Sequence, residues 1–449
     1  MGGRPQTIVA VATAQGRAGV AVVRISGPQV PAISRELVAT DLPPRKALLR
    51  TFLDADGQAI DTGLALSFPA PASYTGEDVL ELHGHGSPVV TDLVVARAIE
   101  LGARLARPGE FSERAFLNGK IDLLQAEAIA DLIDSATAQA ARSAMRTLTG
   151  VFSQRISEVL EQLTTLRMHV EAFIDFPDED ADVFDVASAG HRLGALEASI
   201  DDLLASAREG QLLRDGLRVA IAGRPNVGKS SLLNAMTGRE TAIVTAHPGT
   251  TRDPLHAQVQ LDGLAVLLVD TAGIRDTVDP VESIGVERAR SAARDADVAM
   301  LVVDARCGLG RSEQEILAGI PASTPRLIVY NKIDLTDQPP ALSEDPRGTS
   351  VYLSAKTGAG LPLLAQALRG LSGASSDEGV FIARRRHLEA LRAVHSHVRG
   401  ARLQVSGPNR AELVAEELRQ AQHALATITG DVTSEDLLSQ IFASFCIGK

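Results

Sequence analysis

The spacing of apolar residues first alternates over short stretches, as expected for strands. Thr7–Ser26 predicts two strands around a glycine-containing turn, and the runs at Ala65–Phe68 and Val79–Leu82 are also typical of strands. Val89–Ile99 has the three- and four-residue spacing of a helix. Residues 1–118 are therefore expected to form a small α/β domain.

From about residue 121 to residue 213, apolar residues recur with the period of a helix. Its face comprises Ile156, Val159, Leu160, Leu163, Leu166, Val170 and Phe173 and, beyond an acidic break at Asp175–Asp185, Leu193, Leu196, Ile200, Leu203 and Leu204. The same period returns near the C-terminus at Leu388, Leu391, Val394, Leu437, Leu438, Ile441, Phe442 and Phe445. Such faces predict long amphipathic helices.

Between these helical stretches, apolar runs of strand length alternate with helical segments. The runs are Leu217–Ala222, Val266–Asp270, Ala299–Val303 and Leu327–Tyr330. This alternation predicts a parallel sheet with helices on both faces. A Ser/Gly-rich linker, Ser372–Gly379, ends the segment.

The C-terminal helical tail is too short to form a core of its own, since it has only about 70 residues. We expect it to pack on the helices of residues 121–213, so that the α/β segment is inserted into a helical domain. The predicted fold is α/β plus all-α. Its parts are an N-terminal domain (1–118), a discontinuous helical domain (119–213 and 376–449) and an inserted α/β domain (216–372).

Composition restricts the function classes. The 449 residues have a formal net charge of −12, which excludes binding nucleic acid by bulk positive charge. Aromatic residues make up 3% of the chain, too few for a base-stacking platform. Two cysteines, Cys307 and Cys446, cannot build a disulfide framework. With no signal segment and no run long enough to span a bilayer, a soluble cytoplasmic protein is expected.

The strongest chemical motif is Gly223-Arg-Pro-Asn-Val-Gly-Lys-Ser230, which lies between an apolar strand and a helix start. This is the phosphate-binding loop in its required context, where backbone N–H groups and the helix N-terminus hold phosphate oxygens. Lys229 is expected to reach the β- and γ-phosphates, and the Ser230 hydroxyl to bind Mg²⁺.

Further motifs follow in the order typical of a GTPase. Asp270-Thr-Ala-Gly273 ends the next strong strand, and Gly249-Thr-Thr251 provides candidate switch threonines. Asn331-Lys-Ile-Asp334 ends another strand, and its aspartate can accept two N–H bonds from guanine, whereas adenine leaves that carboxylate unpaired. Ser354-Ala-Lys356 is expected to direct a backbone N–H at the guanine oxygen. These motifs predict a GTPase.

The predicted GTP-binding residues lie within and between these motifs. They are Asn226, Val227, Gly228, Lys229, Ser230, Ser231, Thr245, Ala246, His247, Pro248, Gly249, Thr250, Thr251, Asp270, Thr271, Ala272, Gly273, Asn331, Lys332, Asp334, Ser354, Ala355 and Lys356.

One position departs from the GTPases that orient the attacking water with a glutamine. Ile274 stands in that place, and an apolar side chain cannot orient water. Nearby candidates for this role are Arg275 and the acidic segment Asp276–Glu287, in which Glu282 is either a catalytic group or an ordinary solvated acid.

Over nearly its whole length the sequence resembles the TrmE (MnmE) family of tRNA-modifying GTPases. Besides the GTPase motifs, the matching segments are Arg24–Gly27, Thr75–Glu81, Pro108–Leu117, Gln125–Ile133, Phe176–Glu179 and Phe445–Lys449. The resemblance implies a folate-binding and dimerising N-terminal domain, a discontinuous helical domain and an inserted G domain.

The resemblance also implies a chemistry. A one-carbon unit from 5-formyl- or 5,10-methylene-tetrahydrofolate, with an FAD-dependent partner (MnmG) in a heterotetramer, would build an aminomethyl or carboxymethylaminomethyl group on C5 of the wobble uridine of certain tRNAs. GTP hydrolysis stimulated by K⁺ and approach of the two G domains of a homodimer would drive this cycle.

Site residues follow from the same resemblance. Arg24, Glu81, Lys120 and Lys449 match folate-contacting positions; Ser230 and Thr251 match Mg²⁺ ligands; Asn226 and the carbonyls around Thr245, His247 and Thr250 match a K⁺ site; and Glu282 matches the water-positioning glutamate. Without the resemblance, Arg24, Glu81 and Lys120 would be interpreted as ordinary surface charges.

Three features of the sequence can each be interpreted in two ways. Cys446 is either a nucleophile beside the active site or a buried small apolar residue. His83-Gly-His85 is more typical of a turn than of a metal site. Arg384-Arg-Arg386 either contacts tRNA phosphates or forms a solvated helix start. For the whole chain, the alternatives are a ribosome-assembly GTPase without covalent chemistry and a one-carbon transferase with a regulatory G domain.

Overall fold

The computed structural model forms two compact units, each drawn from separate stretches of chain. The first comprises Met1–Ala130, Leu148–Thr164 and Arg419–Lys449, and the second comprises Asp131–Thr147 and Thr165–Leu418. The structure describes residues 6–175, 186–237, 256–261, 264–270, 296–321, 324–372, 380–405, 407, 410–432, 434–443, 445 and 448.

The first unit begins with a six-stranded sheet of strand order β3-β4-β5-β2-β1-β6. Its strands are β1 (Ile8–Val11), β2 (Ala18–Ser26), β3 (Leu48–Leu53), β4 (Ala59–Phe68), β5 (Val79–Gly86) and β6 (Arg104–Leu105). Neighbouring strands are antiparallel except β1 and β6, which run parallel. The expected strands are confirmed, but β4 and β5 extend beyond the predicted apolar stretches. Polar residues such as Asp61 and Thr62 of β4 and His83 and His85 of β5 interrupt the apolar pattern in the extensions.

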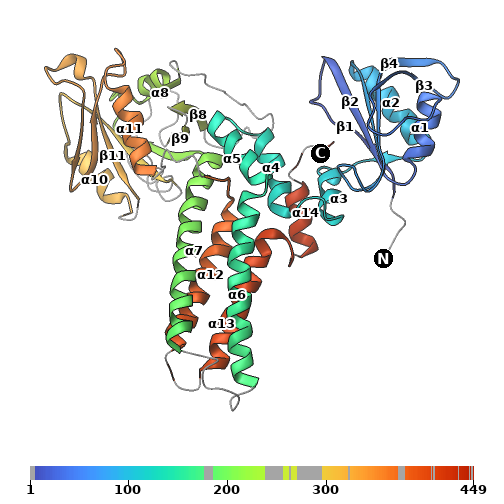
Figure 1. Ribbon diagram of the computed structural model, residues 1–449. Coiled ribbons are helices and arrows are strands. Elements are labelled where there is room, and N and C mark those ends of the chain that lie inside the picture. The colour runs from blue at the N-terminus through green and yellow to red at the C-terminus, as the bar shows by residue number, and fades with distance from the viewer. Residues whose placement is uncertain are drawn as a thin grey trace. The chain divides into compact units, whose positions relative to one another are not determined.

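Helices α1 (Val30–Val38) and α2 (Pro88–Glu100) pack on one face of this sheet (Figure 1). Val23 and Ile25 of β2 point into that core. Because side chains alternate along a strand, Arg24 between them points to the opposite face. There α3 (Glu110–Leu117) contributes Phe111 to a small apolar cluster with Ile8 and Ala10.

Helical segments complete the first unit. Three residues of α4 (Leu123–Ile133) pack with Ile441 and Phe442 of α14 (Glu435–Ala443). In addition, Gln422 Nε2 of α13 (Ala411–Thr429) donates a hydrogen bond of 2.7 Å to Thr164 Oγ1 of α6 (Val151–Asp175). The C-terminal tail therefore packs on the earlier helices, as predicted.

The second unit contains a seven-stranded sheet of order β12-β13-β11-β10-β7-β9-β8. Its strands are β7 (Leu217–Ala222), β8 (His256–Leu261), β9 (Leu264–Asp270), β10 (Val298–Asp304), β11 (Arg326–Asn331), β12 (Ala341–Asp345) and β13 (Gly348–Tyr352). The five central strands are parallel, but the edge strands β8 and β12 are antiparallel. The predicted parallel arrangement is confirmed for the four strands that the apolar runs indicated, β7, β9, β10 and β11. The antiparallel edge strands β8 and β12 were not predicted.

Helices cover both faces of this sheet. α8 (Lys229–Thr237) and α11 (Leu361–Ser372) pack on one face through Leu232 and Leu364, and α10 (Arg311–Gly319) packs on the other through Leu317. The short 3-10 helix η1 (Ile333–Leu335) follows β11.

The same unit contains α5 (Ala138–Leu148), α7 (Val186–Asp215) and α12 (Arg385–Gln404). α7 and α12 lie side by side, with apolar faces that are buried (Figure 1). α7 leads directly into β7, and α12 begins after the last strand of the sheet. The α/β segment is therefore inserted between two packed helices, as the hydrophobic pattern predicted. None of the described helices is long and apolar enough to cross a bilayer.

Candidate functional site

The phosphate-binding motif forms a loop between β7 and α8. Gly223 has φ +147°, and a Cβ there would lie 2.4 Å from the Val302 carbonyl oxygen. Gly228 has φ +96°, and a Cβ there would lie 2.4 Å from Asn331 Nδ2. Asn226 adopts the left-handed φ of +64°. The loop thus depends on its glycines because neighbouring groups leave no room for side chains.

Lys229, the first residue of α8, folds back over this loop. Its Nζ donates hydrogen bonds to the carbonyl oxygens of Gly223 and Arg224, each at 2.9 Å. Ser230 and Ser231 follow in the exposed first turn of the helix. The ammonium group, the hydroxyls and the N-terminus of α8 together form a cradle that fits phosphate oxygens.

Asn331 joins this loop to a second predicted motif. Its Nδ2 donates a 2.9 Å hydrogen bond to the Val227 carbonyl oxygen, and its Oδ1 accepts one of 2.9 Å from the Ala355 N–H. The side chain is almost completely buried. Two motifs separated along the sequence therefore meet at the carboxyl edge of the sheet.

The predicted base-reading residues are adjacent. Ser354 Oγ donates a 2.6 Å hydrogen bond to Oδ1 of Asp334, which lies in η1. Ser354 is buried, whereas Asp334 and Lys356 are exposed. Ser354 thereby orients the carboxylate that is expected to select guanine.

Lys332 directly follows β11, and its backbone has the left-handed φ of +71°. Its side chain extends to the phosphate loop. Its Nζ donates to the Asn226 carbonyl oxygen at 2.5 Å and to Asp304 Oδ2 at 3.0 Å. Hydrogen bonds from Arg306 and then from Lys332 outweigh burial and hold the pKa of Asp304 well below its usual range. Asp304 was not among the residues predicted from the sequence, although its position directly after an apolar strand run is a signal that could have identified it.

The remaining predicted residues of the nucleotide site and the C-terminal tail lie outside the described part of the chain. They are Thr245, Ala246, His247, Pro248, Gly249, Thr250, Thr251, Thr271, Ala272, Gly273, Ile274, Arg275, Glu282, Cys446 and Lys449. Asp270 is the last residue of β9, and its side chain is likewise outside the description.

A second candidate site lies on the face of the N-terminal sheet opposite α1 and α2. Arg24 and Glu81 are paired across β2 and β5, and Arg24 Nη2 lies 2.8 Å from Glu81 Oε1. The Arg24 guanidinium also lies 5.2 Å from the ring centroid of Tyr74 and 5.8 Å from that of Phe111. The structure therefore joins two of the four predicted folate-contacting residues.

Lys120 belongs to the same unit but contacts a different group. Its Nζ donates a 3.0 Å hydrogen bond to the Pro71 carbonyl oxygen. Near the end of the chain, Gly448 has φ +98°, and a Cβ there would lie 2.3 Å from the Val11 carbonyl oxygen. The described end of the chain thus lies against the end of β1.

The prediction of a turn at His83-Gly-His85 was wrong, since these residues belong to strand β5. His83 Nε2 lies 3.3 Å from Glu81 Oε2, and His85 Nδ1 lies 2.7 Å from Asp61 Oδ1. Within the described ranges, no group of three or more His, Cys, Asp or Glu side chains is arranged to hold a metal ion. Both histidines are therefore bound to carboxylates of the sheet.

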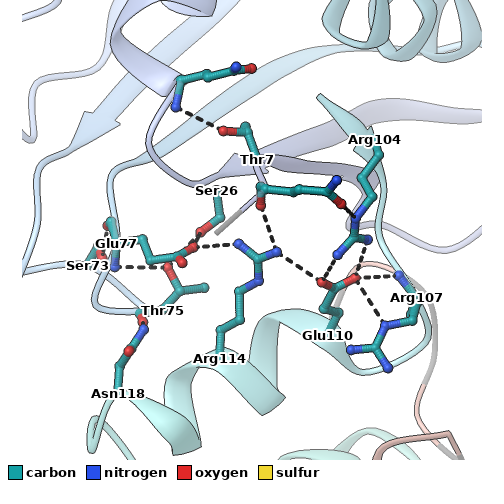
Figure 2. Close-up of polar contacts among 12 residues, drawn as sticks. Thr7, Ser26, Ser73, Thr75, Glu77, Arg104, Arg107, Glu110, Arg114 and Asn118 are labelled. Carbon is teal, nitrogen blue, oxygen red and sulfur yellow. Dashed lines mark hydrogen bonds and ion pairs between the residues drawn. The ribbon is translucent and has the colours of Figure 1, made fainter. Parts of the chain in front are cut away.

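A polar network holds α3 and the loop at residues 73–78 against the sheet (Figure 2). Glu110 accepts hydrogen bonds from Arg104, the Arg107 N–H and Arg114, and Arg114 also donates to Glu77 at 2.8 Å. Burial alone would raise the pKa of Glu110, but these hydrogen bonds lower it to about 2.

This network supports the second candidate site. Tyr74 projects from the loop at residues 73–78 and Phe111 from α3, so the network positions both rings beside Arg24. Burial raises the pKa of Tyr74, whose hydroxyl lies 2.8 Å from Ser112 Oγ. The hydrophobic pattern gave no sign of this network because its members are polar and far apart in sequence.

The arginines at the start of α12 divide between two environments. Arg384 Nη2 lies 2.8 Å from Asp131 Oδ1, and its side chain is mostly buried, so neither predicted role fits it. Arg385 is exposed and lies 2.9 Å from Glu389 Oε1 on the same helix. Arg384 instead anchors the start of α12 to α4.

Comparison with known proteins agrees with this architecture. Residues 7–120 match the family described as GTP-binding protein TrmE N-terminus, and residues 123–446 match MnmE helical domain. The protein named tRNA modification GTPase MnmE from Methylococcus capsulatus is 54% identical to this chain, and the match covers 99% of this chain and 98% of the relative. The protein of the same name from Dechloromonas aromatica is 53% identical, with 99% of this chain and 100% of the relative covered. One from Neisseria meningitidis is 51% identical (99% and 99%). This chain belongs to the MnmE family of tRNA modification GTPases.

Proposed function

We propose that this protein is a GTP-hydrolysing tRNA modification enzyme. With the FAD-dependent partner MnmG, it adds an aminomethyl or carboxymethylaminomethyl group to C5 of the wobble uridine, and the carbon comes from a tetrahydrofolate derivative. The main support for GTP binding and hydrolysis is the Asn331 side chain, which forms hydrogen bonds with both the phosphate loop and the Ser354–Lys356 loop. That arrangement supports phosphate binding and guanine selection at one edge of the sheet.

The described residues have distinct roles toward GTP. Lys229 exchanges its two loop carbonyls for the β- and γ-phosphates. Asp334, held at one oxygen by Ser354, accepts N–H bonds from the guanine edge. The N–H of Ala355 already donates to Asn331 Oδ1, so the Ser354–Lys356 loop is held at a constant distance from the phosphates.

Two cations belong to the proposal. Ser230 and Thr251 would hold Mg²⁺, and Asn226 with the carbonyls around Thr245, His247 and Thr250 would hold K⁺. The exposed Ser230 hydroxyl and Asn226 fit hard cations, which prefer oxygen ligands. When bound, these ions supply positive charge to the phosphates. Asp270 would assist Mg²⁺ binding through a water molecule, and the Gly273 N–H would contact the γ-phosphate.

Glu282 orients the attacking water in this proposal, because Ile274 cannot do so. Substitution of Glu282 by Ala is expected to reduce GTP hydrolysis strongly while nucleotide binding is retained. A Glu282→Ala variant that hydrolyses GTP at the normal rate would exclude this role.

The N-terminal site is proposed to bind the folate. Glu81 can accept N–H bonds from the pterin, and Arg24 holds its carboxylate at 2.8 Å. Lys120 and Lys449 complete the site as basic groups that can meet the carboxylates of the folate glutamate. The support is the coupled Arg24–Glu81 pair, which presents both charges on one sheet face beside two aromatic rings.

Cys446 is proposed to act directly on the uridine or on a folate-bound carbon. A Cys446→Ser variant is then expected to lose tRNA modification and to keep GTP hydrolysis. Normal modification by this variant would leave Cys446 with a structural role only.

We propose that the protein is a homodimer. Leu49 and Leu64 are paired across β3 and β4 on the sheet face that α1 and α2 leave uncovered, and these residues are 65% and 40% exposed. Val20 of β2 is 59% exposed. Apolar residues gathered on one face are typical of an interaction surface.

The proposal also includes a heterotetramer with MnmG, tRNA as the substrate and location in the cytoplasm. The proposed domain boundaries are 1–118 for the N-terminal domain, 119–213 with 376–449 for the helical domain, and 216–372 for the G domain.

The decisive experiment is nucleoside mass spectrometry of bulk tRNA from cells that lack the protein. C5-substituted wobble uridines should vanish and return when the intact gene is restored. Restoration by a Lys229→Ala variant would favour a transferase with a regulatory G domain. Unchanged nucleosides in the deletion strain would favour a ribosome-assembly GTPase, for which ribosome profiles are the next measurement.

A further inference from the structure

Asp304 lies at the carboxyl end of β10, directly beside Asn331 at the end of β11. The two residues are register partners, and the Ala305 N–H donates to the Asn331 carbonyl oxygen at 2.8 Å. Asp304 thus shares the sheet edge with the phosphate loop and the guanine-selecting residues, although it belongs to none of the GTPase motifs found in the sequence.

The carboxylate of Asp304 is held from two sides. Its Oδ1 accepts hydrogen bonds from the Arg306 N–H and Nε, each at 3.0 Å, and its Oδ2 accepts one from Arg306 Nη2 at 2.7 Å. Oδ2 also accepts a bond from Lys332 Nζ at 3.0 Å. Only 11% of the Asp304 side chain is exposed, so its position is well defined.

Lys332 reaches from this carboxylate across the phosphate loop. The same ammonium group donates to the Asn226 carbonyl oxygen at 2.5 Å. Lys332 Cε lies 3.8 Å from the point where a Cβ on Gly228 would be. The lysine stem therefore lies over the glycine that precedes Lys229, and two oxygen atoms at its tip hold it there.

We propose that Asp304 is a positioning residue for nucleotide binding, which holds the Lys332 side chain across the phosphate loop as a wall for the guanine base. This inference rests on the proposed GTP site. Lys332 lies two residues before Asp334, so its methylene stem offers an apolar surface next to the carboxylate that reads the base edge.

Charge explains why an aspartate is suited to this place. A lysine side chain has many rotamers in solution, and ordering it opposes binding. Asp304 orders the Lys332 side chain before the nucleotide binds, because a carboxylate accepts a stronger hydrogen bond from an ammonium group than a neutral oxygen does. An asparagine of the same shape keeps the bonds from Arg306 to Oδ1 but loses the charge that holds Lys332.

The test measures dissociation of fluorescent mant-GDP from the full-length protein by stopped flow. Asp304→Asn is expected to release the nucleotide about tenfold faster, comparable to the cost of ordering one lysine side chain. Asp345→Asn is the matched control, since Asp345 is an acid in the same domain that pairs with exposed Arg347. Its release rate should equal that of the wild type.

A double-mutant cycle separates positioning of Lys332 from a general structural effect. Lys332→Ala should also release mant-GDP faster, and adding Asp304→Asn to it should change the rate by less than twofold. The inference would be overturned if the increases in the mant-GDP release rate caused by the two single substitutions multiply in the double variant. It would also be overturned if Asp304→Asn releases mant-GDP at the wild-type rate. A lower melting temperature for Asp304→Asn together with multiplying effects would assign Asp304 a purely structural role.

The same experiment distinguishes this inference from the proposed function. If the wild-type protein does not bind mant-GDP, the proposed GTP site itself fails. If the wild type binds and Lys332→Ala releases the nucleotide faster while Asp304→Asn does not, the site stands and only the role of Asp304 is rejected.

Discussion

Asn331 and Val227 are joined by a 2.9 Å hydrogen bond across 104 residues of sequence. The donor is the Asn331 side-chain amide, and the acceptor is a backbone carbonyl inside the phosphate loop. Because Asn331 Oδ1 also accepts from the Ala355 N–H, one buried side chain sets the distance between the loop for phosphates and the loop for the base. A nucleotide bound as proposed contacts both loops, so a bond that fixes their separation before binding reduces the ordering that binding requires.

Replacing Asn331 by Ala should therefore weaken binding of GTP and GDP alike. Two buried hydrogen bonds are lost at a cost of about 2 kcal/mol, which corresponds to roughly thirtyfold weaker binding. Titration calorimetry with GDP measures this change. Asn234→Ala, in the exposed part of α8, is the control and should bind GDP normally. Equal affinity of the Asn331 variant and the wild type would show that the bond has no role in presetting the site.

Asp334→Asn should change the base that the protein accepts. The carboxylate accepts two N–H bonds from guanine, whereas an amide presents a donor at one of these positions. We expect GTP binding to fall at least a hundredfold and xanthosine triphosphate, which offers an acceptor there, to bind more tightly than GTP. Competition of both triphosphates against mant-GDP measures the ratio. Preference for GTP in the variant would remove Asp334 from the base-reading role.

Glu110 should make the stability of the N-terminal domain depend on acid pH. Its pKa in the folded protein is about 2, below the ordinary value of 4.5. A lowered pKa means that the charged form stabilises the fold above about pH 5, and that this contribution is lost as the pH falls towards 2. The loss should reach up to about 3 kcal/mol, measured by urea unfolding between pH 6 and pH 2.

Glu110→Gln separates this contribution from general acid unfolding. The variant should be about 3 kcal/mol less stable at neutral pH, because Arg104, Arg107 and Arg114 lose their buried anionic partner. Its stability should also fall less steeply with acid than that of the wild type. Glu36→Gln, on the exposed face of α1, should follow the wild-type curve. Parallel pH curves for Glu110→Gln and the wild type would contradict this account.

Two glycines of α7 should respond in opposite ways to alanine. A Cβ on Gly210 would lie 1.9 Å from the Phe381 carbonyl oxygen, so Gly210→Ala must displace the segment before α12. Gly194 has no heavy atom within 4 Å of such a Cβ. We expect Gly210→Ala to destabilise the protein by about 2 kcal/mol and Gly194→Ala to stabilise it by about 0.5–1 kcal/mol. Thermal unfolding checks both, and equal melting temperatures would show that α7 and Phe381 are not tightly packed.

Arg24→Ala should weaken binding of 5-formyl-tetrahydrofolate at least tenfold. The substitution leaves the Glu81 carboxylate, which is expected to bind the pterin, without the cation that holds it at 2.8 Å. Titration of the full-length protein with the folate measures the effect. Arg35→Ala, which removes a solvent-exposed pair with Asp41, should bind like the wild type. Unchanged affinity in Arg24→Ala would place the folate elsewhere.

Much of the fold was predictable because it depends on local periodicity. The face from Ile156 to Val170 is buried as its three- and four-residue spacing required. The apolar run before Gly223 is strand β7, and the insertion of the α/β segment follows from the helical periods on both sides of it. Edge strand β12 was missed because its sequence, Ala341–Asp345, has few apolar residues to give a pattern.

The order and identity of the GTPase motifs can be recognised without a structure, since each motif needs particular residue types at short spacing. The meeting of distant polar groups becomes visible in the folded chain: Asp304 with Lys332, Glu110 with Arg104 and Arg114, and Arg384 with Asp131. Hydrophobic periodicity records which face of an element is buried, but it carries no information on the partner of a charge. That partner is set by strand order and helix packing, which bring residues together across long stretches of chain.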